Sequence, residues 1–303
     1  MSQYDVIVAG AGIAGLTAAL TAARLGRSTM VLAGDVLGGQ LLSIEKVDGY
    51  PGFPEGVPGY DLCPMAQEQA MAAGAEFAQT KIEGLAPDGD GWKVTTGEGE
   101  MTARAVIVAT GAALRHLGVP GEEQFSGKGV SHCATCDGPL LKNKVAVVVG
   151  GGDSALQEAL TLANFASKTI ILNQGAELTG QASYRQLVTG NGKIEVRNNV
   201  TVSEIVGDTA VTAVRAGGED IPANGVFVYI GLQPEAQFLS GLLALDAAGA
   251  VPTDGAMRTT LKGICAAGTV RAGAAGRAAA SAGDGSVAAV TIDRYLADGD
   301  WPV

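Results

Sequence analysis

The segment Cys133-Ala-Thr-Cys136-Asp137, followed by the glycine-rich run Gly150-Gly-Gly152-Asp153-Ser154-Ala155, carries the strongest signal in this chain. Two cysteines separated by two residues can close a disulfide, and their geometry lowers the pKa of one thiol. A thiolate or a reduced flavin can open such a bond, so two electrons can pass in either direction. An acid directly after the pair can supply or remove the accompanying proton. These residues predict two-electron thiol chemistry beside a nucleotide-binding fold.

Another glycine-rich turn stands near the start of the chain and reads Gly10-Ala-Gly12-Ile-Ala14-Gly15. An apolar strand precedes it, and a helical repeat of leucines and alanines and a second strand follow. This is the dinucleotide-binding fingerprint, whose glycines let a pyrophosphate approach a helix N-terminus. The sequence therefore predicts an α/β protein with two Rossmann-like, three-layer ββα domains, the second inserted into the first. Residues 1–113 and 241–303 are expected to form the first domain, and residues 114–240 the second.

The composition limits the classes of function. Hydrophobic residues make up 47% of the 303 residues and charged residues 17%, which is ample for buried cores. A net charge of −11 makes nucleic acid and an anionic membrane surface poor partners. There is no apolar run of spanning length and no basic leader, and four cysteines in so long a chain are not a disulfide framework. We expect a cytoplasmic protein.

The motifs together resemble those of the low-molecular-weight thioredoxin reductases over essentially the whole chain. Besides the three motifs above, the matching landmarks are Gly38-Gly39-Gln40, Tyr50-Pro51-Gly52, Ala109-Thr110-Gly111 and the run from Gly263 to Gly268. The resemblance implies a homodimer with an FAD domain built from both ends of the chain. It also implies a central domain that holds the pyridine nucleotide and the cysteine pair, and that swivels between flavin and protein substrate.

The resemblance also assigns roles to residues. Cys136 matches the cysteine that faces the flavin, Cys133 the one that exchanges with substrate, and Asp137 the general acid and base. The residues expected to bind FAD are Gly10, Gly12, Ala14, Gly15, Gly39, Gln40, Thr110, Gly111, Gly268, Thr269, Arg277 and Ala278. An inert cysteine pair or half of a metal site is the alternative. Zinc would need a further ligand pair, and only His116 and His132 are near, so no metal site is predicted.

The strand after the second glycine run departs from the family pattern. The family has His-Arg-Arg there, with another arginine four residues later, to clamp the 2′-phosphate of NADPH. This chain reads Asn173-Gln-Gly-Ala-Glu177-Leu-Thr179, without a cation. Each lost charge-assisted phosphate contact costs about 1.5–3 kcal/mol, so weak NADPH binding is expected. NADH is not an obvious replacement, because an acid normally grips the ribose where Asn173 stands.

Two interpretations of this second fold stay open. Either Gly150, Gly152, Asp153, Ser154, Ala155 and Asn173 bind a nucleotide, or the glycine run survives as a packing turn. The FAD side departs as well, since Thr269 replaces the aspartate of the family's Ala-Gly-Asp. Arg277 could place a positive charge near the flavin N1, where it would stabilise an anionic reduced flavin.

Three functions follow from these observations. The first is an FAD flavoenzyme that exchanges electrons between flavin, the Cys133–Cys136 disulfide and a thioredoxin-like protein or small dithiol, with weak or no use of NADPH. The second is the same chemistry without pyridine nucleotide, as a dithiol oxidase or a ferredoxin-dependent reductase. The third, a non-enzymatic flavin- or nucleotide-sensing partner protein, is disfavoured by the intact cysteine motif.

Overall fold

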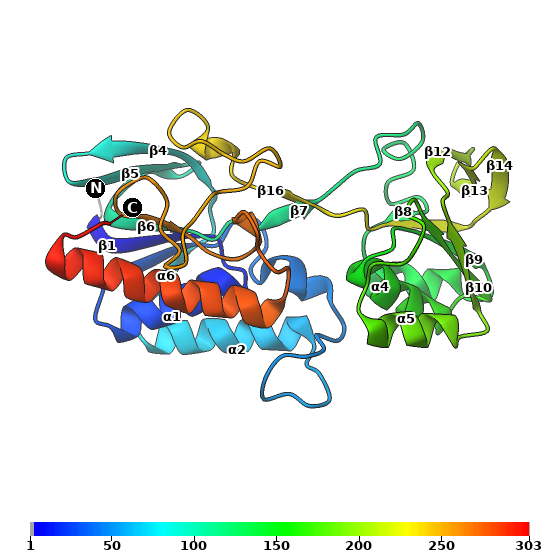
Figure 1. Ribbon diagram of the computed structural model, residues 1–303, viewed down its shortest axis with the longest axis horizontal. Helices are drawn as coiled ribbons and strands as arrows, with labels where there is room; N and C mark the ends of the chain where they lie inside the picture. The colour runs from blue at the N-terminus through cyan, green and yellow to red at the C-terminus, as the bar shows by residue number, and fades with distance from the viewer. Residues whose placement is uncertain (1–2, 303) are drawn as a thin grey trace. The chain divides into compact units, whose positions relative to one another are not determined.

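The computed structural model describes residues 3–302, which form two compact units (Figure 1). One unit consists of Met1–Ala113 and Gln233–Val303, and the other of Leu114–Leu232. The strands at the two crossings, β7 (Ala112–Leu114) and β16 (Leu232–Pro234), pair with each other. By these units the chain returns to the first unit at residue 233, whereas 241 was expected from the sequence. The reason is that Ala236 and Leu239 are fully buried in the hydrophobic core of the first unit.

A seven-stranded sheet forms the centre of the first unit. Its parallel part consists of β1 (Gln3–Ala9), β2 (Thr29–Leu32), β3 (Glu76–Ala78), β6 (Gly99–Val108) and β17 (Ile264–Ala266). Helices α1 (Ile13–Arg24), α2 (Gly59–Ala72) and α6 (Ala278–Asp298) lie along one face (Figure 1). Val6 and Val8 of β1 pack toward these helices, whereas Ile7 packs in the core on the opposite face. This alternation is what a central strand covered on both faces requires.

The opposite face is covered partly by a β-meander. Strands β4 (Ile82–Asp88) and β5 (Gly91–Thr96) pair antiparallel, and β5 continues antiparallel onto β6. Strands β5 and β6 are joined by a turn at Gly97. Strand β6 continues without a break, because its second half pairs with β1 and β17 while its first half still pairs with β5. The predicted ββα layering is thereby confirmed in the first unit.

The second unit repeats this architecture on a smaller scale. Its five parallel strands run in the order β11 (Ile194–Asn198), β10 (Lys168–Asn173), β9 (Val145–Val149), β15 (Gly225–Val228) and β8 (Val130–Ser131). Helices α4 (Asp153–Ala163) and α5 (Ala182–Thr189) pack on one face, and a three-stranded antiparallel sheet, β12 (Val202–Gly207), β13 (Val211–Ala216) and β14 (Glu219–Pro222), packs on the other. The short helix α3 (Ala134–Asp137) contacts α4.

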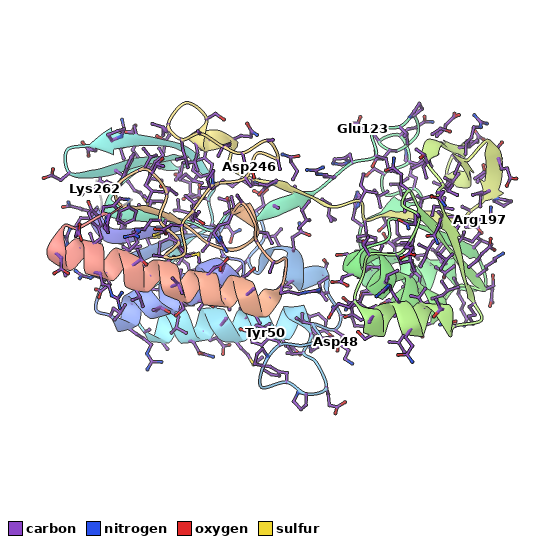
Figure 2. All side chains as sticks on the ribbon, in the orientation of Figure 1. Asp48, Tyr50, Glu123, Arg197, Asp246 and Lys262 are labelled. Carbon is purple, nitrogen blue, oxygen red and sulfur yellow. A yellow bond between two sulfur atoms is a disulfide. The ribbon has the colours of Figure 1, made fainter. Side chains whose placement is uncertain are left out.

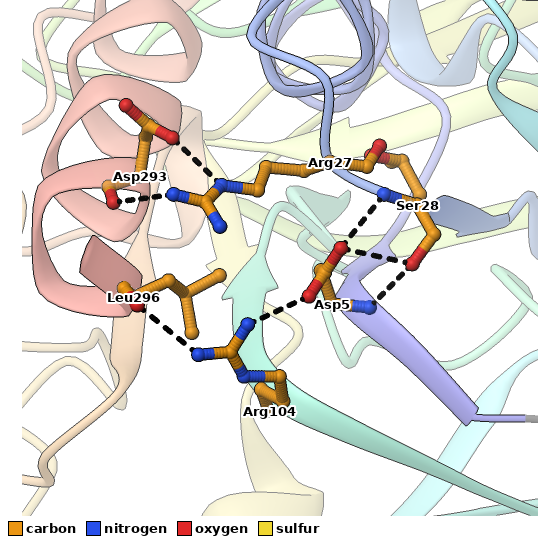
Figure 3. Close-up of polar contacts among 7 residues, drawn as sticks. Asp5, Arg27, Ser28, Arg104, Asp293 and Leu296 are labelled. Carbon is orange, nitrogen blue, oxygen red and sulfur yellow. Dashed lines mark hydrogen bonds and ion pairs between the residues drawn. The ribbon is translucent and has the colours of Figure 1, made fainter.

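A polar network ties the end of α6 to the start of the chain (Figure 3). Arg27 donates from Nε to Asp293 Oδ1 at 2.7 Å, and Arg104 donates to Asp5 Oδ1 at 2.9 Å and to the Leu296 carbonyl at 3.1 Å. Burial alone would raise the pKa of Asp5, but the bonds from Arg104 and Ser28 outweigh it and hold that pKa below its ordinary value. The last helix is thus fixed to the central sheet by charge as well as by packing.

Candidate functional site

The cysteine pair lies on a short helical turn in the second unit. Cys133 caps α3, and it forms a disulfide with Cys136 across a Cα–Cα distance of 5.3 Å. Three hydrogen bonds shape the turn: Cys136 N–H donates to Cys133 Sγ at 3.1 Å, Asp137 N–H to the Cys133 carbonyl at 3.1 Å, and Cys133 N–H to Ser131 Oγ at 3.1 Å. Cys136 is exposed and Cys133 half-buried. The predicted pair therefore forms a disulfide on a turn where Cys136 is accessible.

A buried carboxylate supports this turn from behind. Glu158 of α4, only 4% exposed, accepts from Ala134 N–H at 2.7 Å and from the Tyr229 hydroxyl at 2.9 Å, both at Oε2. Burial, followed by the charge of Glu158, raises the pKa of Tyr229 far above its ordinary value, so this phenol stays a donor. Neither residue has a sequence signal, because the contacts span 24 and 71 residues of chain.

The other titratable groups of the motif are also placed. Asp137 ends α3 and is half-buried. His132 Nδ1 lies 3.1 Å from the Val228 carbonyl oxygen. Because a carbonyl oxygen only accepts, Nδ1 carries the proton in the neutral ring and Nε2 carries none. The His116 ring meets the His132 ring edge-on at 5.9 Å, and His116 Nδ1 lies 3.7 Å from Glu122. The two histidine rings thus lie against each other, and His132 directly precedes Cys133 in the sequence.

In the first glycine turn, two glycines are closely packed and one faces open space. A Cβ on Gly10 would lie 2.3 Å from the Ala109 carbonyl oxygen, and one on Gly15 would lie 1.9 Å from that of Gly10. A Cβ on Gly12 would meet nothing within 4 Å. Gly12 caps α1 without a side-chain hydrogen bond, and the first turn of the helix carries no acid. This open helix N-terminus fits a pyrophosphate, as FAD would present.

The remaining residues predicted to bind FAD gather around this turn. Gly39 lies against Gly12, and Gly38 N–H donates to the Ala11 carbonyl at 2.9 Å. Gln40 Nε2 donates to the Ala112 carbonyl at 3.2 Å, and Thr110 Oγ1 to the Glu235 carbonyl at 2.6 Å.

Several of these residues come from the far end of the chain. A Cβ on Gly111 would lie 3.6 Å from Thr269 Oγ1, and one on Gly268 would lie 2.9 Å from the Ala14 Cβ. Arg277 is exposed and caps α6, whereas Ala278 packs with the Ile13 cluster. Both ends of the first unit therefore contribute to one surface.

Two acidic residues of the first unit were not predicted from the sequence. Asp284 of α6 accepts from Gly268 N–H at 3.1 Å and is paired with Arg271, whose Nε lies 2.9 Å from Oδ2. Nothing in the sequence pattern indicates this contact, since it depends on how α6 docks. Asp35 follows β2, is exposed and pairs with Lys81. Its place twenty residues after Gly15 is the spacing typical of a ribose-binding acid, so this signal was available.

The second glycine turn is used more fully for packing. A Cβ on Gly150 would lie 2.1 Å from the Tyr229 carbonyl oxygen, and one on Gly151 would lie 2.4 Å from Asn173 Oδ1. Gly152 alone faces open space, with Thr179 Oγ1 4.0 Å from the position of a Cβ. Asp153 begins α4 and accepts from Gln181 N–H at 2.6 Å, Ser154 is exposed, and Ala155 is buried.

Asn173 is engaged by its own loop. Its Nδ2 donates to the carbonyls of Gly175 and Glu177 and to Asn198 Oδ1, at 3.1, 3.0 and 2.8 Å, and its Oδ1 accepts from Gly175 N–H. The side chain is 6% exposed. Both Nδ2 hydrogens are therefore used inside the protein.

The loop after Asn173 folds back onto the glycine turn. The N–H groups of Thr179 and Gly180 both donate to the Gly151 carbonyl, at 2.8 and 3.1 Å. Arg197, which is labelled in Figure 2, lies in register with Leu172 on the neighbouring strand. Its Nε lies 2.5 Å from Glu195 Oε1. A cavity of about 130 Å³ remains at the N-terminus of α4, lined in part by Gly152, Ser154 and Tyr229. Sites for whole cofactors usually measure several hundred Å³.

A larger hollow, of about 680 Å³, lies on the first unit between the β4–β5 hairpin and the end of α6. It is lined in part by Trp92, Arg104, Lys262 and Tyr295, and it contains none of the predicted site residues. The chemistry of the glycine turns therefore decides the assignment, not the size of the hollow.

Comparison with known proteins fits this geometry. A family model described as pyridine nucleotide-disulphide oxidoreductase matches residues 4–285. The chain belongs to this family. A thioredoxin reductase of Listeria innocua is 42% identical over 97% of this chain and 94% of its own. One of Bacillus subtilis is 40% identical, with 97% and 95% covered. The crystal structure of the Lactococcus lactis thioredoxin reductase matches with a TM-score of 0.94 at 36% identity, covering 97% of this chain and 99% of that one.

These relatives confirm the predicted class. The chain is an FAD-dependent disulfide oxidoreductase of the low-molecular-weight thioredoxin reductase class, with the predicted two Rossmann-like folds. They do not favour the dithiol oxidase, the ferredoxin-dependent reductase or the non-enzymatic alternative. Between residues 3 and 302, no helix is long and apolar enough to cross a membrane. Over the same residues, no group of three histidine, cysteine or acidic side chains is arranged to hold a metal ion.

Proposed function

We propose that this protein passes two electrons from FAD in the first unit, through the Cys133–Cys136 disulfide, to the disulfide of a thioredoxin-like protein. The observation that carries the proposal is the accessible disulfide on the α3 turn, in a chain whose other glycine turn leaves an open helix N-terminus. The relatives named thioredoxin reductase support the choice of substrate. A homodimer, which the family resemblance implies, and a location in the cytoplasm are also part of the proposal.

FAD, when bound, supplies the two-electron redox chemistry of this site. Gly12 and the N-terminus of α1 would hold its pyrophosphate, because no side chain fills that position. Asp35 would bind the ribose hydroxyls, and Thr110, Gly111, Gly268 and Thr269 would line the remainder. Arg277 would place a positive charge beside the ring and favour its reduced anionic form.

The exchange with substrate balances in two steps. The Cys133 thiolate attacks one sulfur of the substrate disulfide, forming a mixed disulfide and releasing the other substrate sulfur as a thiolate, which takes up a proton. The Cys136 thiolate then attacks Cys133 Sγ, which restores the internal disulfide and releases the second substrate sulfur. Asp137 would hold and deliver the proton for this exchange. The exposure of Cys136 supports its role as the cysteine that reaches the flavin.

We further propose that NADPH is a poor electron donor for this protein. Asn173 is closed into its own loop, the loop from residue 173 to 181 carries no lysine or arginine, and Arg197 is already paired with Glu195. Gly152 still leaves room for a phosphate at α4. The N-terminus of α4 can thus still bind a pyrophosphate, but no cation is placed to bind the 2′-phosphate. NADPH and NADH should therefore bind weakly and about equally.

Two anaerobic titrations of the FAD-loaded protein test the electron transfer to thioredoxin and the weak use of NADPH in turn. The protein is reduced with dithionite, which reduces both the flavin and the Cys133–Cys136 disulfide, and after removal of the excess reductant it is mixed with oxidised thioredoxin. Reoxidation of flavin and disulfide should give four new thioredoxin thiols per chain. A Cys136→Ser variant should lose this transfer and serves as the control. Full transfer by that variant would overturn the role of the pair.

In a second titration, NADPH and NADH are added separately to the oxidised protein and flavin bleaching is followed. Bleaching by micromolar NADPH, with NADH at least tenfold weaker, would refute the proposal on the nucleotide. Bleaching by reduced ferredoxin instead would identify the donor.

A further inference from the structure

We propose that Glu158 is a positioning residue of the redox centre, whose buried charge makes the reduced Cys133–Cys136 pair a stronger reductant. The inference rests on the redox role of this pair proposed above. It concerns the equilibrium between disulfide and dithiol, which can be measured without a nucleotide or a protein substrate.

The contacts of Glu158 are made with the turn that carries both cysteines. Its Oε2 lies 2.7 Å from the N–H of Ala134, the residue that directly follows Cys133, and Ala134 is fully buried. The Tyr229 hydroxyl donates to the same oxygen at 2.9 Å from the end of β15. Glu158 therefore connects α4, the β15 end and the first residue of α3.

Burying a carboxylate at this position costs free energy. Glu158 projects from the face of α4 that also carries the buried Leu156, Ala159 and Leu162. Taking a charge out of water costs several kcal/mol even when it is hydrogen-bonded, and an apolar residue often serves packing as well or better. The Ala134 N–H and the Tyr229 hydroxyl both donate to Oε2, and hydrogen bonds of this kind stabilise the ionised form of a carboxyl against the cost of burial.

The charge acts on the state in which the disulfide is open. Free N–H groups at a helix N-terminus stabilise a thiolate, and this is how such pairs obtain a low thiol pKa and become oxidising. Here the Cys136 N–H still donates to Cys133 Sγ, but the Ala134 N–H is committed to Glu158, whose carboxylate places a negative charge behind the turn. The half-buried Asp137 at the end of α3 adds a second acid, and His132 is bound through Nδ1 to the Val228 carbonyl. A thiolate is disfavoured, so the closed disulfide is favoured.

A lower reduction potential of the cysteine pair suits a reductase. A pair whose disulfide is the more stable state gives up its electrons readily, and its reduction potential is lower. Removing the charge while keeping the shape should shift the equilibrium toward the dithiol and lower the pKa of the attacking thiol.

Glu158→Gln is the decisive variant, because the amide oxygen still accepts from Ala134 and Tyr229 while the charge is lost. Holoprotein is equilibrated anaerobically with glutathione buffers, the thiols are trapped by alkylation, and the Cys133–Cys136 peptide is analysed by mass. The equilibrium constant for disulfide reduction should rise at least tenfold, which corresponds to about 30 mV. The reduced variant should also alkylate faster at pH 6 than the parent protein.

Two further variants separate charge from structure. Glu195→Gln makes the same chemical change at a carboxylate on β11 that pairs with Lys168 and Arg197, and it should leave the equilibrium unchanged. Tyr229→Phe keeps the Glu158 charge and removes one donor, so the thiolate should be disfavoured further and alkylation should slow. A merely structural role predicts the same direction for Tyr229→Phe and Glu158→Gln, or a loss of thermal stability alone.

Each result decides the question. No change in the equilibrium for Glu158→Gln, or a shift of the same sign in Tyr229→Phe, would overturn the inference. If Glu158→Gln does not fold, the sign of the Tyr229→Phe shift decides it. Failure to reduce thioredoxin would refute the proposed function and leave this equilibrium measurement intact.

Discussion

Replacing Gly12 by alanine should weaken FAD binding without unfolding the protein. Gly12 has φ of −72°, which alanine adopts freely, and a Cβ there would meet no atom within 4 Å. The loss at the helix N-cap, below about 1 kcal/mol, is offset by the lower entropy of the unfolded chain. In the complex, the same methyl group would occupy the space that the pyrophosphate needs. Overpacking of this kind costs about 1–3 kcal/mol, which weakens FAD binding roughly 5- to 140-fold.

The assay compares flavin content, apoprotein stability and FAD affinity. Apoprotein of Gly12→Ala should melt within about 2 °C of the parent apoprotein, while FAD titration by flavin fluorescence shows the weakened affinity. Gly15→Ala is the matched control, because its Cβ would lie 1.9 Å from the Gly10 carbonyl oxygen and should destabilise the apoprotein itself. Unchanged FAD affinity in Gly12→Ala would refute the assignment of this turn to the pyrophosphate.

Three further outcomes follow from buried and charged groups. Burial raises the pKa of Cys63 to about 11 and that of the Cys265 thiol further, so at pH 8 only about 0.1% of Cys63 is thiolate. In mass-spectrometric alkylation, the reduced redox pair should label while both buried thiols do not, and Cys63 labelling should increase about tenfold per pH unit up to pH 10; rapid labelling at pH 8 would contradict this. Asp284→Asn should lower the free energy of unfolding by about 1–3 kcal/mol in urea, because it leaves the half-buried Arg271 with a weaker partner, and an unchanged midpoint would refute this. Asp5 has a lowered pKa, so its stabilisation is present above pH 3.8 and is lost as pH falls through its folded pKa. The stability difference between the parent and Asp5→Asn, below about 1 kcal/mol at neutral pH, should therefore vanish in acid; a difference that grew in acid would be the wrong sign.

The glycine turns and their strands could be predicted because their signals are local. Gly10, Gly15 and Gly150 are required by contacts with backbone a few ångströms away, and each stands at a fixed place after an apolar strand. The confirmed fold class rests on these local patterns. The placement of Gly268 beside Ala14 depended on the family resemblance, since no spacing rule connects residues so far apart in the sequence.

The rest could not be predicted because it depends on packing between distant segments. The boundary at residue 233 is set by Ala236 and Leu239, which a sequence pattern shows only as ordinary apolar residues. Glu158 and Asp284 each stand on a helix where a carboxylate would ordinarily face water. Only the docking of α4 and α6 shows that each accepts a backbone N–H at a functional turn.

The two glycine turns of the chain differ in how much of each is used for packing. In the first, Gly12 is open, the helix N-terminus is uncapped, and both halves of the unit converge on it. In the second, Gly151 is covered by the Asn173 amide, its carbonyl receives two N–H groups from the following loop, and an acid begins the helix. Asn173 closes that loop because its amide donates twice and accepts at once, which a histidine, the first residue of the family's His-Arg-Arg, cannot do in either protonation state. Asn173 therefore stabilises a loop that carries no lysine or arginine, and this agrees with the weak NADPH binding proposed above.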